Sequence, residues 1–230
     1  MQQFGRKLGR KLKIELQMLA LNQGKDTEQM IVWTVQPWSV WVQLKTHGTI
    51  NTVINNSALL DLKHKYSDLP STNELRAYQW MIKQMSMRIS SSPNSAMYPY
   101  WCWHTWNGQH KLFLKEHRYY NNQAVIELDI PDSEILLSDF DKWHFALNNW
   151  FLPSSIDDEK VFEKENKEFE LKPSQSAKEA SWGHIFEVTG SDFVQGCFWQ
   201  LKYDQVVKVY HQNLNHHLKI IIPKRRQFTV

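Results

Sequence analysis

The stretch Ala124-Val-Ile-Glu-Leu-Asp-Ile130 alternates with a period of two residues. Val125, Glu127 and Asp129 fall on one side of an extended chain, and the three other large apolar residues fall on the opposite side. This pattern predicts a half-buried β-strand. Its two carboxylates then share one face, which is either solvated or turned into a cleft.

The segments around this strand predict the other elements of the fold. Further strands are expected at residues 30–35, 98–106, 193–203 and 218–222, and helices at 38–47, at 75–89 and after a cap at Asp139 or Asp141. Residues 204–210 fit either a helix or a strand. Strands and helices do not alternate as parallel βαβ units require, so the sequence predicts an α+β fold.

The chain of 230 residues is expected to form one core domain over residues 30–222. Residues 1–29 are predicted to be an extension that contains a basic amphipathic helix ending near Gly24, and Met30 could itself be the initiator. Residues 154–180 are predicted to be a charged surface insertion, and residues 223–230 a basic tail. We therefore expect a chain that starts at Met30 to fold cooperatively.

Composition limits where the protein works and what it binds. The net charge of +3 is too small to indicate nucleic acid by itself. Two cysteines are too few for a disulfide framework, which predicts free thiols and a cytoplasmic location. No apolar run is long enough to span a bilayer, which predicts no membrane insertion. The sequence leaves the oligomeric state open.

Several common chemical sites are missing from the sequence. It holds only eight glycines, and it contains neither a phosphate-binding glycine-rich loop nor a dinucleotide fingerprint. The nucleophile-elbow, zinc-protease and C-x-x-C motifs are absent as well. The histidines do not follow a recurrent metal-ligand spacing, so no metal site is predicted.

An aromatic run is the most unusual feature of a chain that contains eleven tryptophans. Most of these indoles are expected to fill the core. In the run 98–106, however, alternation places Trp101 and Trp103 on one face and Tyr100, His104 and Trp106 on the other. Both faces cannot easily be ordinary core, so one face is predicted to line a cleft that stacks a flat ring.

Five segments together resemble a bacterial family described only as a domain of unknown function, over about residues 30–212. They are Ile31-Val-Trp-Thr-Val-Gln36, Tyr78-Gln-Trp-Met81, Tyr98-Pro-Tyr-Trp-Cys-Trp103, Leu136-Leu-Ser-Asp-Phe-Asp-Lys-Trp-His144 and Val194-Gln-Gly-Cys-Phe-Trp-Gln-Leu201. That resemblance implies no activity.

The order of these elements is also similar to the DNA-targeting ADP-ribosyltransferase toxins of bacterial toxin–antitoxin pairs. This resemblance implies a split β-sandwich with peripheral helices that binds NAD without a glycine-rich loop. It matches Thr34 or Gln36 to a first-strand residue that holds the cofactor. It also implies a late-strand glutamate that stabilises the cationic ribose, but that position holds Cys197. Gln195 is then the nearest polar candidate, and Glu127 is a carboxylate that could replace the missing one.

Two hypotheses follow. The first is an ADP-ribosyltransferase-like domain that binds NAD or a related nucleotide and modifies nucleic acid. Its predicted catalytic residues are Gln195 and Glu127. Its predicted cofactor-binding residues are Thr34, Gln36, Tyr78, Trp101, Trp103, Ser138, Asp139 and His144. The second hypothesis is a non-enzymatic module that binds nucleic acid or a protein partner, in which Asp139 is only a helix cap.

Overall fold

In the computed structural model of the protein, the described residues are 28–52, 72–93, 98–112, 123–154, 174–212 and 218–223. The predicted extension 1–29 lies outside them except for its last two residues. Most of the predicted insertion and all but one residue of the predicted tail also lie outside. Residues 175–180 of that insertion belong to a helix, Gln175–Ser181.

An antiparallel sheet of seven strands organises the fold, in the order β5-β6-β3-β1-β4-β8-β9. Its strands are β1 (Gln29–Pro37), β3 (Tyr100–Thr105), β4 (Gln123–Pro131), β5 (Leu136–Asp139), β6 (Val194–Phe198), β8 (Val206–Gln212) and β9 (Leu218–Ile221). A second sheet pairs β2 (Thr49–Asn51) with β7 (Gln200–Lys202). The helices are α2 (Trp38–His47), α4 (Thr72–Arg88), α5 (Phe140–Leu147) and α7 (Gln175–Ser181), with 3-10 turns η3 (Asp132–Glu134), η4 (Trp182–Phe186) and η5 (Tyr203–Gln205). The fold is therefore a mixed α+β domain built on a large antiparallel sheet.

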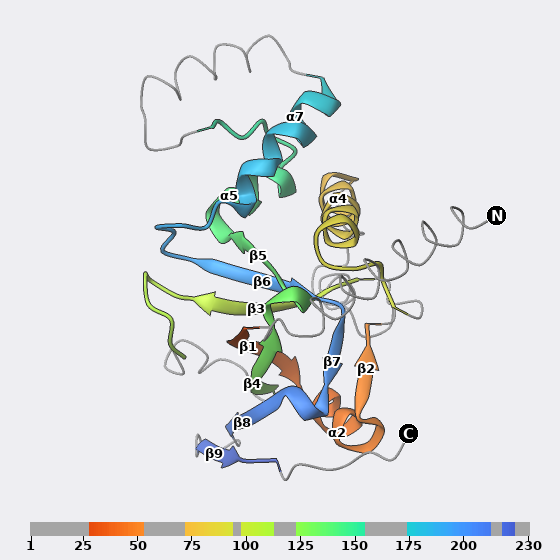
Figure 1. Ribbon diagram of the computed structural model, residues 1–230, viewed down its shortest axis with the longest axis vertical. Helices are drawn as coiled ribbons and strands as arrows, with labels where there is room; N and C mark the ends of the chain where they lie inside the picture. Colours follow the sequence, from red (N-terminus) through yellow and green to blue (C-terminus); the bar gives the residue numbers. More distant parts are fainter. Residues whose placement is uncertain are drawn as a thin grey trace, which may run out of the picture.

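The helices cover different parts of the sheet (Figure 1). Helix α2 packs with the small sheet against one face, where Trp41 and Leu44 join a core that includes Ile126. Helices α4 and α5 gather with η4 at the β5–β6–β3 end, where Met81 and Trp182 lie in a second core. No helix among the described residues has the length and apolarity needed to cross a membrane.

Strand β4 has neighbours on both sides, and this changes the expected exposure of its residues. It pairs with β1 along its whole length and with β8 along most of it. Ile126 and Leu128 are fully buried, as the alternation predicts. Val125 and Glu127 on the opposite face are also buried, whereas Asp129 is only half-buried. A solvated face is therefore the wrong interpretation for Glu127.

Local signals place the helix ends correctly. Helix α2 begins after Pro37 and ends at Gly48, whose φ of 75° lies in the left-handed region that favours glycine. Helix α5 begins after Asp139, whose carboxylate accepts a hydrogen bond from the backbone N–H of Lys142 at 2.9 Å. This cap confirms the predicted start of that helix.

Other expectations need correction. The run 193–203 is not one strand, because the chain leaves the large sheet after Phe198 and enters the small one at Gln200. Residues 206–212 form a strand, which resolves the choice between helix and strand. The indole of Trp150, expected in the core, is half exposed because it follows the end of α5.

We expect Gly196→Ala to destabilise the domain. A Cβ at Gly196 would lie 2.8 Å from Cδ1 of Ile135, which is closer than real Cβ atoms come, and 3.1 Å from Sγ of Cys102, which is tighter than most contacts. Overpacking of this kind costs about 1–3 kcal/mol. Urea unfolding measures the loss. The control is Gly183→Ala, where nothing lies within 4 Å of the added Cβ, and an equal loss in both variants would contradict the packing argument.

Candidate functional site

One row of side chains crosses six strands of the large sheet. It contains Ser138 in β5, Gln195 in β6, Trp103 in β3, Trp33 in β1, Glu127 in β4 and Lys208 in β8, each the direct partner of the next. Direct cross-strand partners project from the same face of a sheet. These six residues, the cross-strand row, therefore bring both predicted catalytic residues and two predicted cofactor-binding residues to one face.

The Gln195 end of the row holds buried polar groups without partners. Gln195 is 6% exposed and Ser138 is 0% exposed. Neither Nε2 of Gln195 nor Oγ of Ser138 has a hydrogen-bond partner among the described residues. A buried group left this way costs about 1–3 kcal/mol, so two neighbouring ones indicate a place that a ligand or an ordered water satisfies.

The Glu127 end of the row is fully engaged. Oε2 of Glu127 accepts hydrogen bonds from Nε1 of Trp33 at 3.2 Å and from the hydroxyl of Tyr210 at 2.8 Å. Nζ of Lys208 lies 3.5 Å from Oε1. Burial, followed by the hydrogen bond to Glu127 and its charge, raises the pKa of Tyr210 to about 12. The Tyr210 hydroxyl therefore remains a donor to this carboxylate at neutral pH.

The two ends of the row are too far apart to act on one atom. Gln195 and Glu127 lie three strands apart, and neighbouring strands are about 4.8 Å apart, which separates their Cα atoms by about 14 Å. They therefore contact different parts of an extended ligand or act separately.

Partly exposed rings surround Trp103, which lies in the middle of the row. The ring centroids of Trp103 and Trp106 are 4.6 Å apart, and those of Trp103 and Phe140 are 5.0 Å apart. Phe193 lies 5.4 Å from Trp106, and His144 lies 4.7 Å from Phe140. We call these five residues the aromatic patch. It includes His144, whose Nδ1 is 2.9 Å from the carbonyl oxygen of Phe140.

Tyr78 and Trp101 belong to a separate aromatic cluster next to the row. The Tyr78 ring contacts Trp101 and Trp143 edge-to-face, with centroids 6.0 and 5.9 Å apart. Burial, and then the charges of Glu74 and Cys197, raise the pKa of Tyr78 to about 12. Trp101 is the partner of Cys197 in the register of β3 and β6. Tyr78 of α4 thus packs against Trp101 of β3, and these two predicted cofactor-binding residues lie apart from the aromatic patch.

The structure separates three other predicted residues from the row. Thr34 and Gln36 alternate with Trp33 along β1, so they project from the opposite face. The Thr34 hydroxyl donates to the carbonyl oxygen of Trp101 at 2.7 Å, and Nε2 of Gln36 donates to that hydroxyl. Asp139 uses both oxygens locally, one for the helix cap and one for the hydroxyl of Ser191 at 2.6 Å.

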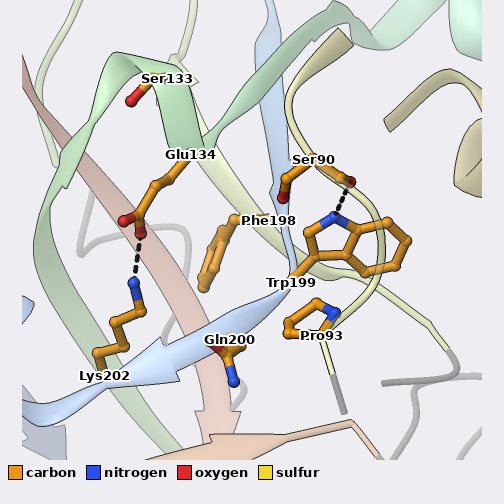
Figure 2. Close-up of a pocket in the computed structure, with 8 residues that line it drawn as sticks. All are labelled: Ser90, Pro93, Ser133, Glu134, Phe198, Trp199, Gln200 and Lys202. Atoms are coloured by element: carbon orange, nitrogen blue, oxygen red, sulfur yellow. Dashed lines mark hydrogen bonds and ion pairs between the residues drawn. The ribbon is translucent and has the colours of Figure 1, made fainter. Parts of the chain in front are cut away.

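A cavity of about 270 Å³ lies where the chain passes between the two sheets, and we call it the Glu134 cavity. Figure 2 shows the Phe198 ring between the Glu134–Lys202 ion pair and the indole of Trp199. Nζ of Lys202 is 2.7 Å from Oε2 of Glu134, and Nε1 of Trp199 donates to the carbonyl oxygen of Ser90 at 2.8 Å. The charged groups and the indole N–H of the Glu134 cavity are therefore already paired within the protein.

A second cavity, of about 390 Å³, lies between two turns at the end of β3, and we call it the His104 cavity. The turns contain Gly108 and Gly190, whose φ angles are 69° and 80°. The N–H of Gly108 donates to the carbonyl oxygen of Asp192 at 2.9 Å and ties the turns together. The Asn107-Gly108 turn was predictable from the sequence, but its contact with residues 188–192 was not.

The partners of Glu127 could not be predicted from local sequence patterns. Trp33 and Tyr210 are 94 and 83 positions away along the chain, and only the pairing of β4 with β1 and β8 brings them together.

Among the described residues, no group of three or more His, Cys, Asp or Glu side chains is arranged to hold a metal ion.

Both cysteines are buried free thiols. Burial raises the pKa of Cys102, and burial followed by the charge of Cys102 raises that of Cys197. Protonated, inaccessible thiols are poor nucleophiles. The two cysteines therefore contribute to packing rather than to chemistry.

We expect neither thiol to react with a disulfide reagent in the native protein near pH 8, and both to react in guanidinium. Above about pH 8.5 unfolded thiols lose their protons while folded ones keep them, so the free energy of unfolding should fall as pH rises. Thiol titration with and without denaturant measures the first effect, and denaturant unfolding across this pH range measures the second. Rapid native labelling of either cysteine would contradict the burial.

Comparison with known proteins gives one match. The model of the family described as "Domain of unknown function (DUF3841)" matches residues 31–207, which is more than half of the chain. No curated protein and no solved structure matches the chain.

Proposed function

The chain belongs to the DUF3841 family, whose description carries no activity, and from the geometry of the site we propose that it binds NAD or a related nucleotide along the cross-strand row. The observation that supports this proposal most strongly is the pair of unpartnered groups on Gln195 and Ser138 beside the indole of Trp103.

A nicotinamide fits these three residues chemically. Its carboxamide offers an acceptor for Nε2 of Gln195 and a donor for Oγ of Ser138. Its flat ring can pack against Trp103 or the neighbouring rings of the aromatic patch. Binding would then satisfy two buried groups that otherwise cost free energy.

We propose slow ADP-ribosyl transfer, or none. Cleavage of the bond between nicotinamide and ribose develops positive charge on the sugar, which a carboxylate stabilises and an amide cannot match. Glu127 is the carboxylate in the row, and three neighbouring groups already engage it. Cys197 offers no substitute, because its pKa is raised by burial.

The aromatic patch favours a second candidate, a non-enzymatic module for nucleic acid. Four of its rings are only partly buried and His144 is exposed, so they present ring surface at the molecular boundary. Stacking of a base on an aromatic side chain contributes about 1–3 kcal/mol and tolerates any base. In this second candidate function, the cross-strand row would support the aromatic patch and would not hold a cofactor.

Titration calorimetry distinguishes the two candidates. We expect NAD to bind the full chain and Gln195→Ala to weaken binding by up to about tenfold, since a neutral hydrogen bond contributes about 0.5–1.5 kcal/mol. Gln36→Ala, on the opposite face, is the control and should bind like the wild type.

The same titration is repeated with a single-stranded oligonucleotide. Oligonucleotide binding that falls with salt, with no heat from NAD, would support the nucleic-acid module instead. Equal NAD affinity in Gln195→Ala and the wild type would contradict the proposed position of the ligand.

A further inference from the structure

The His104 cavity lies outside the cross-strand row. Leu137 and Val194 line it, and they alternate along β5 and β6 with Ser138 and Gln195. Alternating residues project from opposite faces of a sheet, so the cavity opens on the other face from the row. A ligand there would therefore be independent of the proposed nucleotide site.

Polar groups converge on this cavity from both of its turns. His104, Thr105, Ser191 and Asp192 all line it, and Nδ1 of His104 lies 2.8 Å from the hydroxyl of Thr105. The side chain of Asp192 is exposed, and that of His104 is half-buried. The cavity thus presents carboxylate, imidazole and hydroxyl groups to whatever enters it.

The charges at the cavity argue for a neutral ligand. None of the described residues that line it is Lys or Arg, so a phosphate or carboxylate would meet Asp192 without a compensating cation. Burial, followed by the neighbouring His110, lowers the pKa of His104, so its imidazole is uncharged at neutral pH. An uncharged His104 supplies no positive charge to attract an anion.

The size and lining of the cavity suit a small molecule. Its volume of about 390 Å³ falls within the range of about 300–1,000 Å³ typical of small-molecule sites. Leu137, Val188 and Val194 supply apolar lining, and the other lining side chains include hydroxyl, imidazole and carboxylate groups. A ligand that carries several hydroxyls, each able to donate and accept hydrogen bonds, suits such a lining.

We propose that the His104 cavity binds a neutral polyhydroxylated ligand, such as a free pentose or hexose. Asp192 accepts hydrogen bonds from its hydroxyls, His104 and Thr105 pair with a further hydroxyl, and the carbon face of the ring packs on the apolar lining.

Nuclear magnetic resonance of the full chain tests this proposal. D-ribose and D-glucose are added separately in the millimolar range, and the backbone amides of Gly108 and Gly190 report on the cavity. We expect saturable shifts of both amides with at least one sugar. The indole N–H of Trp199 in the Glu134 cavity should stay in place, and inorganic phosphate should give no saturable shift.

Asp192→Asn keeps the shape of the side chain but removes its charge, and we expect it to weaken sugar binding by about tenfold, as for loss of a charge-assisted hydrogen bond. The variant should fold, because the Asp192 side chain is exposed. Thr105→Val gives a second test. Gln195→Ala should bind sugar normally, so failure of the nucleotide site would not affect this result. The proposal is overturned by no shift with either sugar, by unchanged affinity in both cavity variants, or by saturable binding of phosphate.

Discussion

Trp182→Ala is expected to lower the free energy of unfolding by about 3–5 kcal/mol, the range for replacing a buried large aromatic residue by alanine. Trp182 is 0% exposed and packs edge-to-face on Trp80, with ring centroids 5.4 Å apart. Its Nε1 also donates to the carbonyl oxygen of Trp150 at 2.7 Å. Since a domain is stable by only about 5–15 kcal/mol, we expect this variant to lose about a fifth or more of its stability.

Two phenylalanine variants separate packing from hydrogen bonding. Trp182→Phe keeps much of the ring but leaves the carbonyl of Trp150 without its donor, at a cost of about 1–3 kcal/mol. Trp41→Phe removes an Nε1 that has no acceptor among the described residues, so its hydrogen-bond cost should be near zero. Denaturant unfolding measures all three variants. A smaller loss for Trp182→Phe than for Trp41→Phe would contradict the assigned role of the hydrogen bond.

The second large effect concerns turnover of NAD. We expect the wild type to consume NAD slowly or not at all, and any activity at low NAD to fall by up to about tenfold in Gln195→Ala, because Gln195 holds the nicotinamide through a neutral hydrogen bond. We expect Glu127→Gln to keep most of the activity, because Glu127 is already engaged by Trp33, Tyr210 and Lys208. The measurement is release of nicotinamide at a temperature where both variants are fully folded.

Other results with Gln195→Ala and Glu127→Gln would contradict these expectations. Loss in Glu127→Gln alone would move the chemistry to the β4 end of the row. Full activity in both variants would show that the cross-strand row takes no part in catalysis. The glutamine at position 127 retains an acceptor for Trp33 and Tyr210, so the comparison tests charge rather than folding.

The elements of the fold were largely predictable because local patterns determine them. The alternation at 124–130, the glycine after α2 and the aspartate before α5 each correspond to an element or a boundary in the structure. The break at Trp199 was not predictable. Residues 193–203 are continuously strand-like, and only pairing with two different sheets divides them.

The candidate site was predictable only in part. Trp103 in the aromatic strand and Gln195 in the late strand, both named as candidates from the sequence, are direct partners in the sheet. Whether Thr34 and Gln36 lie on the same face of the sheet as Gln195 depends on the register between distant strands. Local spacing does not determine that register. The burial of Glu127 likewise depends on Trp33 and Tyr210, which reach it from the strands on either side.

The most direct test of the proposed nucleotide site is the response of assigned indole N–H resonances to NAD. We expect saturable shifts for Trp103 in the cross-strand row and for Trp106 in the aromatic patch, weakened in Gln195→Ala. We expect no shift for Trp41 in the opposite core or for Trp199 in the Glu134 cavity. Shifts confined to Trp41 or Trp199, or no shift of Trp103 at saturating NAD, would contradict the proposed nucleotide site.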